Sequence, residues 1–239
     1  MTLGAYARAS DTGRKRRRNE DSYVVAPPLF AVADGMGGAQ AGEVASQLAA
    51  SALEAGDSDG LEGTERVDAL IQEANRRIYD RAATDPTASG MGTTMTVALV
   101  EGMTVAIGHV GDSRAYLVRG EQMEQLTEDH SLVNELLKTG KLSEEEAQIH
   151  PQRSVITRAV GTDPDVDVDG FTIEAEDESG GNSPELTFTW DTASGKNGDK
   201  LHLTITPYVR TNRPAMFVIT SVSAKGDAQN AWYGFVGVD

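Results

Sequence analysis

Asp34 follows an apolar run, residues 29–33, that predicts a buried strand. A carboxylate at the end of a strand is held rigidly, and the glycine after it, Gly35, lets the backbone carbonyl approach the same ion. Mg²⁺ and Mn²⁺ prefer such oxygen donors. Asp-Gly alone is usually a turn signal, but the segment Asp34-Gly35-Met36-Gly37-Gly38 closing a buried strand is more specific. It predicts a divalent-metal site with Asp34 as the central ligand.

A second group of charged residues also precedes a predicted strand. Glu20 and Asp21 are adjacent carboxylates, and Arg16 lies five residues before Asp21, within the basic run 14–18. One loop could therefore present a guanidinium and a carboxylate together, and arginine matches phosphate oxygens in a bidentate fork. The alternative is that the acids form a solvated corner and the basic run a solvated loop or a local nucleic-acid patch.

A third carboxylate, Asp112, lies in the segment 108–114 between two predicted strands. It could be a further ligand at the edge of a sheet or only a turn residue. For His109 and His130 we expect structural polar contacts rather than catalysis, and for Met36 we expect packing.

The pattern of apolar residues predicts helices covering antiparallel strands. Helical spacing marks residues 42–55 and 64–83, and shorter helices are expected over 132–139 and from a capping box at Ser143. Strands are expected over 93–100, 103–110 and 114–119, the first two joined by a tight hairpin. Hairpins with paired helices favour an α+β fold over alternating parallel units.

Near residue 177 the character of the sequence changes. An acidic stretch and a Gly/Ser-rich segment lead into four strand-like runs without an evident helix: 185–191, 200–209, 215–223 and 231–238. We therefore divide the chain into residues 1–177 and a β-rich segment, 178–239. Trp190, Trp232 and Tyr233 could form a binding platform in that segment, although buried strand aromatics are the commoner case.

Bulk composition narrows the classes of function. The 239-residue chain has no cysteine, which excludes disulfides, thiolate zinc sites and cysteine nucleophiles. Its net charge of −16 argues against nonspecific nucleic-acid binding. The first residues do not resemble a signal peptide, and no apolar stretch approaches the roughly 18 residues of a membrane helix. We expect a cytoplasmic monomer that binds neither nucleic acid nor membrane.

Several motifs occur in the order and spacing of one known family. They are Gly13-Arg14-Lys15-Arg16, Asn19-Glu20-Asp21-Ser22, Asp34-Gly35-Met36-Gly37-Gly38, Gly92-Thr93-Thr94, Gly111-Asp112-Ser113-Arg114, Thr127-Glu128-Asp129-His130-Ser131, His150-Pro151-Gln152-Arg153-Ser154 and Ile156-Thr157-Arg158-Ala159-Val160-Gly161-Thr162. Over residues 1 to about 177 the chain resembles the PP2C-type (PPM) protein phosphatases, above all the bacterial serine/threonine phosphatases.

The resemblance implies an α-β-β-α four-layer sandwich and hydrolysis of phosphoserine or phosphothreonine on proteins. Asp34 would bridge two Mn²⁺ or Mg²⁺ ions, and the Gly35 carbonyl would bind one of them. Asp21 would act through metal-bound water, with Glu20 assisting. Asp112 would help to hold a third, looser metal, and Arg16 would grip the substrate phosphate. Phosphorylated proteins are the implied substrates, and a serine/threonine kinase is a candidate partner.

The sequence departs from this family in its last third. The family carries two more aspartates there, one in a Ser-Asp-Gly-Leu stretch that closes a core strand and one in a Gly-Gly-x-Asp-Asn stretch, and neither stretch is present. Asp191 and Asp227 are weak candidates for replacements. Without both carboxylates a dinuclear site has few fixed anions. The alternative function is therefore a catalytically weak or dead pseudophosphatase, or a chimeric binding module with a C-terminal β-domain.

Overall fold

The computed structural model describes residues 3–10, 12, 18–37, 41–56, 60–119 and 122–174, and the backbones of four later strands over 186–191, 200–205, 215–220 and 233–238. The helices of this described part are α1 (Ala41–Ala55), α2 (Gly63–Thr84), the short 3-10 helix η1 (Pro86–Ala88), α3 (Leu132–Lys138) and α4 (Glu144–Ile149). None of the helices in these ranges is long and apolar enough to cross a membrane.

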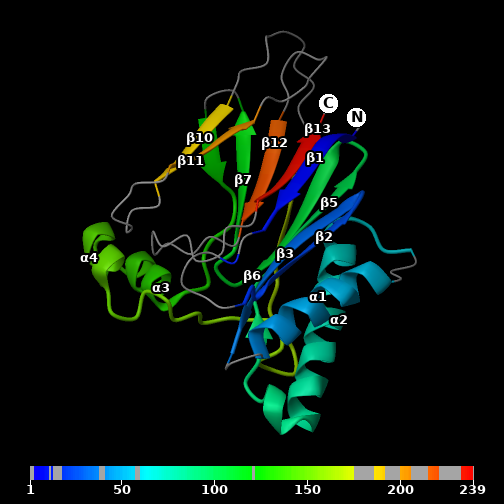
Figure 1. Cartoon of the computed structure of the whole chain (residues 1–239), viewed down its shortest axis with the longest axis vertical. Helices are drawn as coiled ribbons and strands as arrows, with labels where there is room; N and C mark the ends of the chain where they lie inside the picture. The colour runs from blue at the N-terminus through cyan, green and yellow to red at the C-terminus, as the bar shows by residue number, and fades with distance from the viewer. Residues whose placement is uncertain are drawn as a thin grey trace.

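An antiparallel sheet in the order β2-β3-β5-β6-β9 carries the first motifs, and β4 pairs with β3 beyond this path. Its strands are β2 (Asp21–Ala26), β3 (Leu29–Met36), β4 (Gly92–Thr93), β5 (Met95–Glu101), β6 (Thr104–Val110) and β9 (Asp169–Glu174). The hairpin between β5 and β6 turns at Gly102, whose positive φ of 61° suits glycine. Helices α1 and α2 pack side by side on one face of this sheet (Figure 1).

A second antiparallel sheet has the order β1-β13-β12-β7-β8. Its strands are β1 (Leu3–Ala9), β13 (Tyr233–Val238), β12 (Ala215–Thr220), β7 (Arg114–Arg119) and β8 (Gln122–Gln125). Two strands from the last quarter of the chain therefore lie between two strands from its first half. The remaining pair, β10 (Leu186–Asp191) and β11 (Lys200–Ile205), bond to each other.

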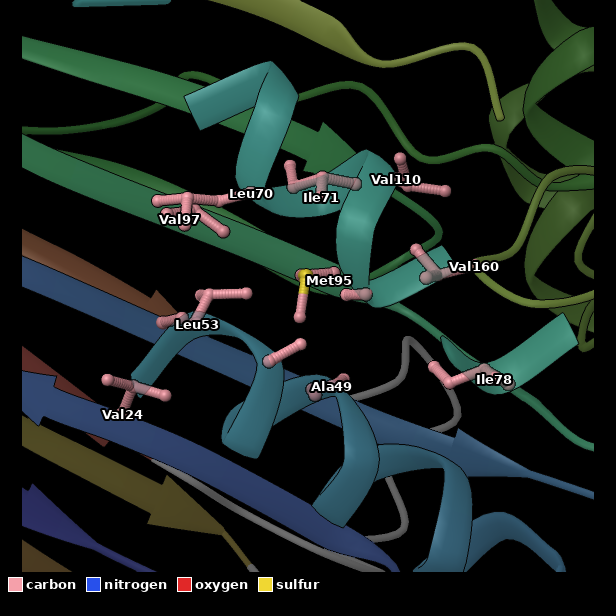
Figure 2. Packing of buried hydrophobic residues seen from close by; sticks show 14 of the residues in the cluster. Val24, Ala49, Leu53, Leu70, Ile71, Ile78, Met95, Val97, Val110 and Val160 are labelled. Atoms are coloured by element: carbon pink, nitrogen blue, oxygen red, sulfur yellow. The ribbon is translucent and has the colours of Figure 1, made fainter. Parts of the chain in front are cut away.

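The two faces of β3 contribute to two apolar clusters. Ala31 and Ala33 face a large cluster that α1 and α2 complete, and Figure 2 shows part of this cluster around Met95. Phe30 and Val32 point the other way and join Leu117 of β7 in a second cluster, between the sheets. The alternation follows from the two-residue period of a strand. Because β3 is buried on both faces, the residues at its end are firmly placed.

Most of the elements expected from the sequence occur within a residue or two of the predicted bounds. The capping box at Ser143 is present, with the Ser143 side chain and the Glu146 side chain each bonded to the other's backbone. The sequence patterns did not single out β1, β8 or β9 as strands. β8 has one apolar residue, Met123, and all four of its residues are exposed, so no apolar alternation marks it. The α+β class is confirmed.

Candidate active site

Asp34 and Asp21 lie opposite each other where β2 and β3 meet the edge of their sheet. Their Cα atoms are partners in the antiparallel register, and the next residue, Gly35, donates its N–H to the Glu20 carbonyl oxygen at 3.0 Å. Both carboxylate oxygens of Asp21 are buried. The structure therefore brings three predicted site residues, Glu20, Asp21 and Asp34, to one place.

Gly35 is confined by the first turn of α1. A Cβ added at Gly35 would lie 1.9 Å from the Gly42 carbonyl oxygen and 2.7 Å from that of Glu20. A Cβ at Gly42 would in turn lie 2.8 Å from the Gly35 carbonyl oxygen. Two glycines thus allow β3 and α1 to approach each other at the residue after Asp34. This close approach explains the glycine of the Asp-Gly pair better than a turn does.

Thr94, between β4 and β5, fixes the backbone of Asp34. The Asp34 N–H donates to Thr94 Oγ1 at 2.9 Å, and the Thr94 N–H donates to the Asp34 carbonyl oxygen at 2.9 Å. Thr94 Oγ1 also lies 2.7 Å from Ser113 Oγ. Thr94 is 1% exposed. It therefore connects the strand end that carries Asp34 to the turn that carries Asp112.

Asp112 is half-buried and occupies the turn between β6 and β7. Gly111 before it has a φ of 108°, and a Cβ there would lie 2.6 Å from the Thr94 side chain. Arg114 after it makes a two-pronged ion pair with Asp129, at 2.8 Å and 2.6 Å. These hydrogen bonds raise the pKa of Arg114 above its ordinary value. The turn around Asp112 is thus held from both sides.

The two predicted structural histidines are buried and lie beside each other, with ring centroids 4.9 Å apart. His109 Nε2 lies 3.0 Å from the Glu128 carbonyl oxygen, which can only accept, so Nε2 carries the hydrogen. His109 Nδ1 then accepts from the Thr96 hydroxyl at 2.9 Å. Burial, followed by the proximity of His130, lowers the pKa of His109 to about 4. The expectation of structural contacts agrees with this hydrogen bonding.

Some predicted site residues cannot be placed. Arg16, the predicted phosphate-binding residue, lies outside the described residues, as does Asp227. Arg18, of the same basic run, contacts Glu43 of α1 at 3.4 Å and is more than half exposed. Asp191 is the last residue of β10, and its backbone lies opposite that of Lys200 in the register with β11. Its strand bonds to neither of the two larger sheets over the described backbones.

The donors gathered at this edge suit a hard divalent cation. Asp21, Asp34 and the Gly35 carbonyl are oxygen donors on rigid backbone, which Mg²⁺ and Mn²⁺ prefer. No group of three or more His, Asp or Glu side chains is arranged to hold a metal within the described ranges. The residues therefore fit part of a metal site, with further ligands required from water or from elsewhere in the chain.

Comparison with known proteins identifies the family. A family profile described as protein phosphatase 2C matches residues 12–136, more than half of the chain. The serine/threonine phosphatase stp of Listeria innocua is 42% identical over 175 residues, which are 69% of this chain and 69% of that protein. The chain belongs to the protein phosphatase 2C family. This membership confirms the sequence resemblance, and with it the prediction of a PP2C-type serine/threonine protein phosphatase.

Solved structures of PP2C phosphatases resemble the whole chain. The Mycobacterium tuberculosis phosphatase PstP/Ppp matches with a TM-score of 0.75 and 29% identity, covering 99% of this chain and 98% of that one. The catalytic domain of PstP in complex with two manganese ions matches with a TM-score of 0.72 and 27% identity, covering 99% of both chains. The PP2C-like α+β fold is therefore shown.

Two residues that position the PP2C motifs were not predicted as part of the site. Thr94 belongs to the motif Gly92-Thr93-Thr94 but bonds to Asp34, 60 positions away. His130 was expected to be structural, and its contact with Gly111 spans 19 positions. The only signal in the sequence was that both residues belong to family motifs.

Proposed function

We propose that this PP2C phosphatase hydrolyses phosphoserine and phosphothreonine on proteins at a dinuclear Mn²⁺ or Mg²⁺ site. The observation that carries the proposal is the register of β2 and β3, which sets Asp21 opposite Asp34 beside the confined backbone of Gly35. The manganese ions of the PstP catalytic domain support the choice of metal. The four-layer sandwich of the family is the proposed scaffold.

Each site residue has a proposed role. Asp34 and the Gly35 carbonyl would hold the ions, Asp21 would orient a metal-bound water, and Glu20 would assist. Asp112 would help to bind a third, looser ion. When bound, two dications would lower the pKa of a water molecule and so supply a nucleophile for the phosphoester. Arg16 would bind the phosphate oxygens in a bidentate fork.

The proposed setting combines the family resemblance with the composition of the chain. The substrates would be phosphorylated proteins, with a serine/threonine kinase as a candidate partner, and the enzyme would act in the cytoplasm as a monomer. Residues 1–177 would carry the phosphatase motifs and 178–239 would form the β-rich remainder. The net charge of −16 does not favour binding to the phosphate backbone of nucleic acids.

The test compares Asp34→Asn with wild type in p-nitrophenyl phosphate hydrolysis over a range of Mn²⁺ concentrations. Asp80→Asn is the matched control, because it also replaces a carboxylate by an amide, but in an exposed ion pair on α2. We expect turnover by wild type and by Asp80→Asn, and its loss in Asp34→Asn. Equal turnover in all three proteins would remove the assignment of Asp34.

A noncatalytic phosphoprotein-binding module is the second candidate. It is motivated by the two family carboxylates missing from the sequence and by the lack of a three-carboxylate group over the described ranges. Calorimetric titration with Mn²⁺ separates the candidates. At least one tight site in wild type, weakened in Asp34→Asn, supports the enzyme; weak binding alone, with no turnover in a folded protein, supports the second candidate.

A further inference from the structure

His130 lies between the turn that carries Asp112 and a segment that approaches from the other side. It is 8% exposed and follows the segment that ends at Asp129, just before α3. Its backbone and its ring both make hydrogen bonds, and the partners fall into two groups. Gly111 lies on the side of the turn, and Thr157 and Asp169 lie on the opposite side.

On the turn side, His130 bonds to Gly111 twice. The His130 N–H donates to the Gly111 carbonyl oxygen at 2.7 Å, and the Gly111 N–H donates to His130 Nδ1 at 3.0 Å. Nδ1 accepts a hydrogen bond and therefore carries no hydrogen, so in the neutral ring Nε2 carries it. Both backbone polar groups of Gly111 are thus bonded to the same residue.

On the other side, His130 bonds to the segment that leads into β9. Its Nε2 donates to Asp169 Oδ2 at 3.0 Å, and its carbonyl oxygen accepts from the Thr157 N–H at 2.9 Å. Arg158 Nη1 donates to the other Asp169 oxygen at 2.6 Å. Arg158 Nη1 also lies 3.1 Å from His130 Nε2, but both atoms are donors, so this contact follows from sharing Asp169.

The charge state of Asp169 is consistent with this arrangement. Burial raises the pKa of its carboxyl group, but hydrogen bonds from His130 and Arg158 outweigh burial and leave the pKa below its ordinary value. Asp169 therefore accepts from two donors as a carboxylate. It is also the partner of His109 across β6 and β9, which sets Asp169 beside the two neighbouring histidine rings.

The turn needs an external support of this kind. Gly111 has no side chain, and its φ of 108° combined with the 2.6 Å approach to Thr94 excludes one. Thr94 holds the turn at Ser113, after Asp112, whereas His130 holds it at Gly111, before Asp112. The backbone of Asp112 is thus fixed on both sides, by different residues.

We propose that His130 is a positioning residue for the phosphatase reaction, fixing the Gly111-Asp112 turn through Nδ1 and tying it to Asp169 through Nε2. The inference rests on the proposed function, in which Asp112 helps to bind a metal ion. Residues that orient ligands without touching the metal commonly matter for affinity and activity, with losses of about 10- to 100-fold when they are removed.

Two amide substitutions separate the two bonds of the ring. In His130→Asn, Oδ1 takes the place of Nδ1 and can still accept from Gly111, while the short side chain no longer reaches Asp169. In His130→Gln, Nε2 takes the place of the ring Nε2 and can still donate to Asp169, while the acceptor for Gly111 is lost. The proposal assigns the larger defect to His130→Gln.

The first readout does not depend on activity: amide hydrogen exchange at Gly111, measured relative to Ile107 in the middle of β6. We expect the Gly111 amide to exchange about tenfold faster or more in His130→Gln. Losing one hydrogen bond shifts the equilibrium between the closed and the locally open turn by about that factor. In His130→Asn it should stay close to wild type. Equal exchange in wild type and both variants would overturn the proposal.

The second readout is the Mn²⁺ concentration that gives half-maximal hydrolysis of p-nitrophenyl phosphate. It should rise by about tenfold or more in His130→Gln and less in His130→Asn. A larger rise in His130→Asn would overturn the assignment of Nδ1 as the atom that matters. If wild type shows no turnover, the proposed function fails, while the exchange comparison still decides whether His130 holds the turn.

Discussion

At the scale of single residues, the site depends on a buried threonine as much as on its carboxylates. Thr94 Oγ1 accepts from the Asp34 N–H at 2.9 Å and bonds to Ser113 Oγ at 2.7 Å. A hydroxyl can do both because it has one hydrogen and two lone pairs. The position of Asp34 relative to the Asp112 turn is therefore set by one side chain.

Thr94→Val should weaken both the fold and the site. Valine has the shape of threonine but leaves the Asp34 N–H without its acceptor, which costs about 1–3 kcal/mol of unfolding free energy. Thr94→Ser keeps the hydroxyl and is the matched control. Urea unfolding with the metal chelated measures stability, and Mn²⁺ titration measures the site. If Thr94→Ser lost Mn²⁺ affinity as much as Thr94→Val, the methyl group rather than the hydroxyl would be responsible.

The placement of residues could be predicted where the information is local. Each carboxylate of Asp34, Glu20 and Asp21 stands beside a predicted strand, and the structure brings them together at one sheet edge. Their roles at a metal stay predictions. The role of Thr94 depends on contacts made only after β3 and β5 pair, and no spacing in the sequence encodes them. The phosphate-binding role of Arg16 stays a prediction, because that residue lies outside the described ranges.

At the scale of elements, β12 brings the C-terminal third to the edge that carries Asp112. β12 pairs with β7 so that its last residue, Thr220, lies opposite Arg114, two positions after Asp112. The family pattern closes a core strand with Ser-Asp, whereas the sequence after Thr220 reads Ser221-Val222. If β12 is the strand that the family pattern closes, Val222 stands in the sequence where that pattern has aspartate.

Val222→Asp should strengthen metal binding if β12 is the strand that the family pattern closes with aspartate. An added carboxylate increases the negative charge available to a dication, and site affinity depends on the number of charged ligands. We expect calorimetric Mn²⁺ affinity to rise by about tenfold, the usual order for one ligand-shell change. Val222→Asn adds the same shape without charge and should give a smaller gain. An unchanged Mn²⁺ isotherm in Val222→Asp would argue against matching β12 to the strand that the family pattern closes with aspartate.

The order of the strands was harder to predict than the strands themselves. The sequence indicated strands over 215–223 and 231–238 from their composition, and β12 and β13 occupy those ranges. Their position between β1 and β7 could not be predicted, because it joins segments about 100 to 230 residues apart and alternation shows burial rather than partners. The boundary near residue 177 stays a prediction.

At the scale of the whole molecule, the buried polar residues behind the site link folding to pH. His109 is completely buried, and in its neutral form Nδ1 accepts from the Thr96 hydroxyl at 2.9 Å. The titratable groups around it are His130, Asp129 and Asp169, and the desolvation of the ring outweighs their effects on the pKa of His109. Protonating His109 therefore places a charge in a site closed to water, which is unfavourable in the folded state.

The stability of the metal-free protein should fall as the pH drops from about 6.5 to about 4. The pKa of His109 is lowered from 6.5 to about 4 in the folded state. In that window the unfolded chain takes up a proton that the folded one does not, so stability is present above pH 6.5 and is lost below it. The full difference corresponds to about 3 kcal/mol. Urea unfolding at several pH values, with chelator, measures it.

The contribution of His109 can be separated from that of the carboxylates by one substitution. His109→Gln keeps a donor toward the Glu128 carbonyl oxygen but cannot titrate, so its stability should change less between pH 6.5 and pH 4 than that of wild type. His150→Gln, at the end of α4, removes a histidine elsewhere and should keep the wild-type slope. If His109→Gln kept that slope as well, the acid sensitivity would belong to the carboxylates, and the buried ring would not be the group that links folding to pH.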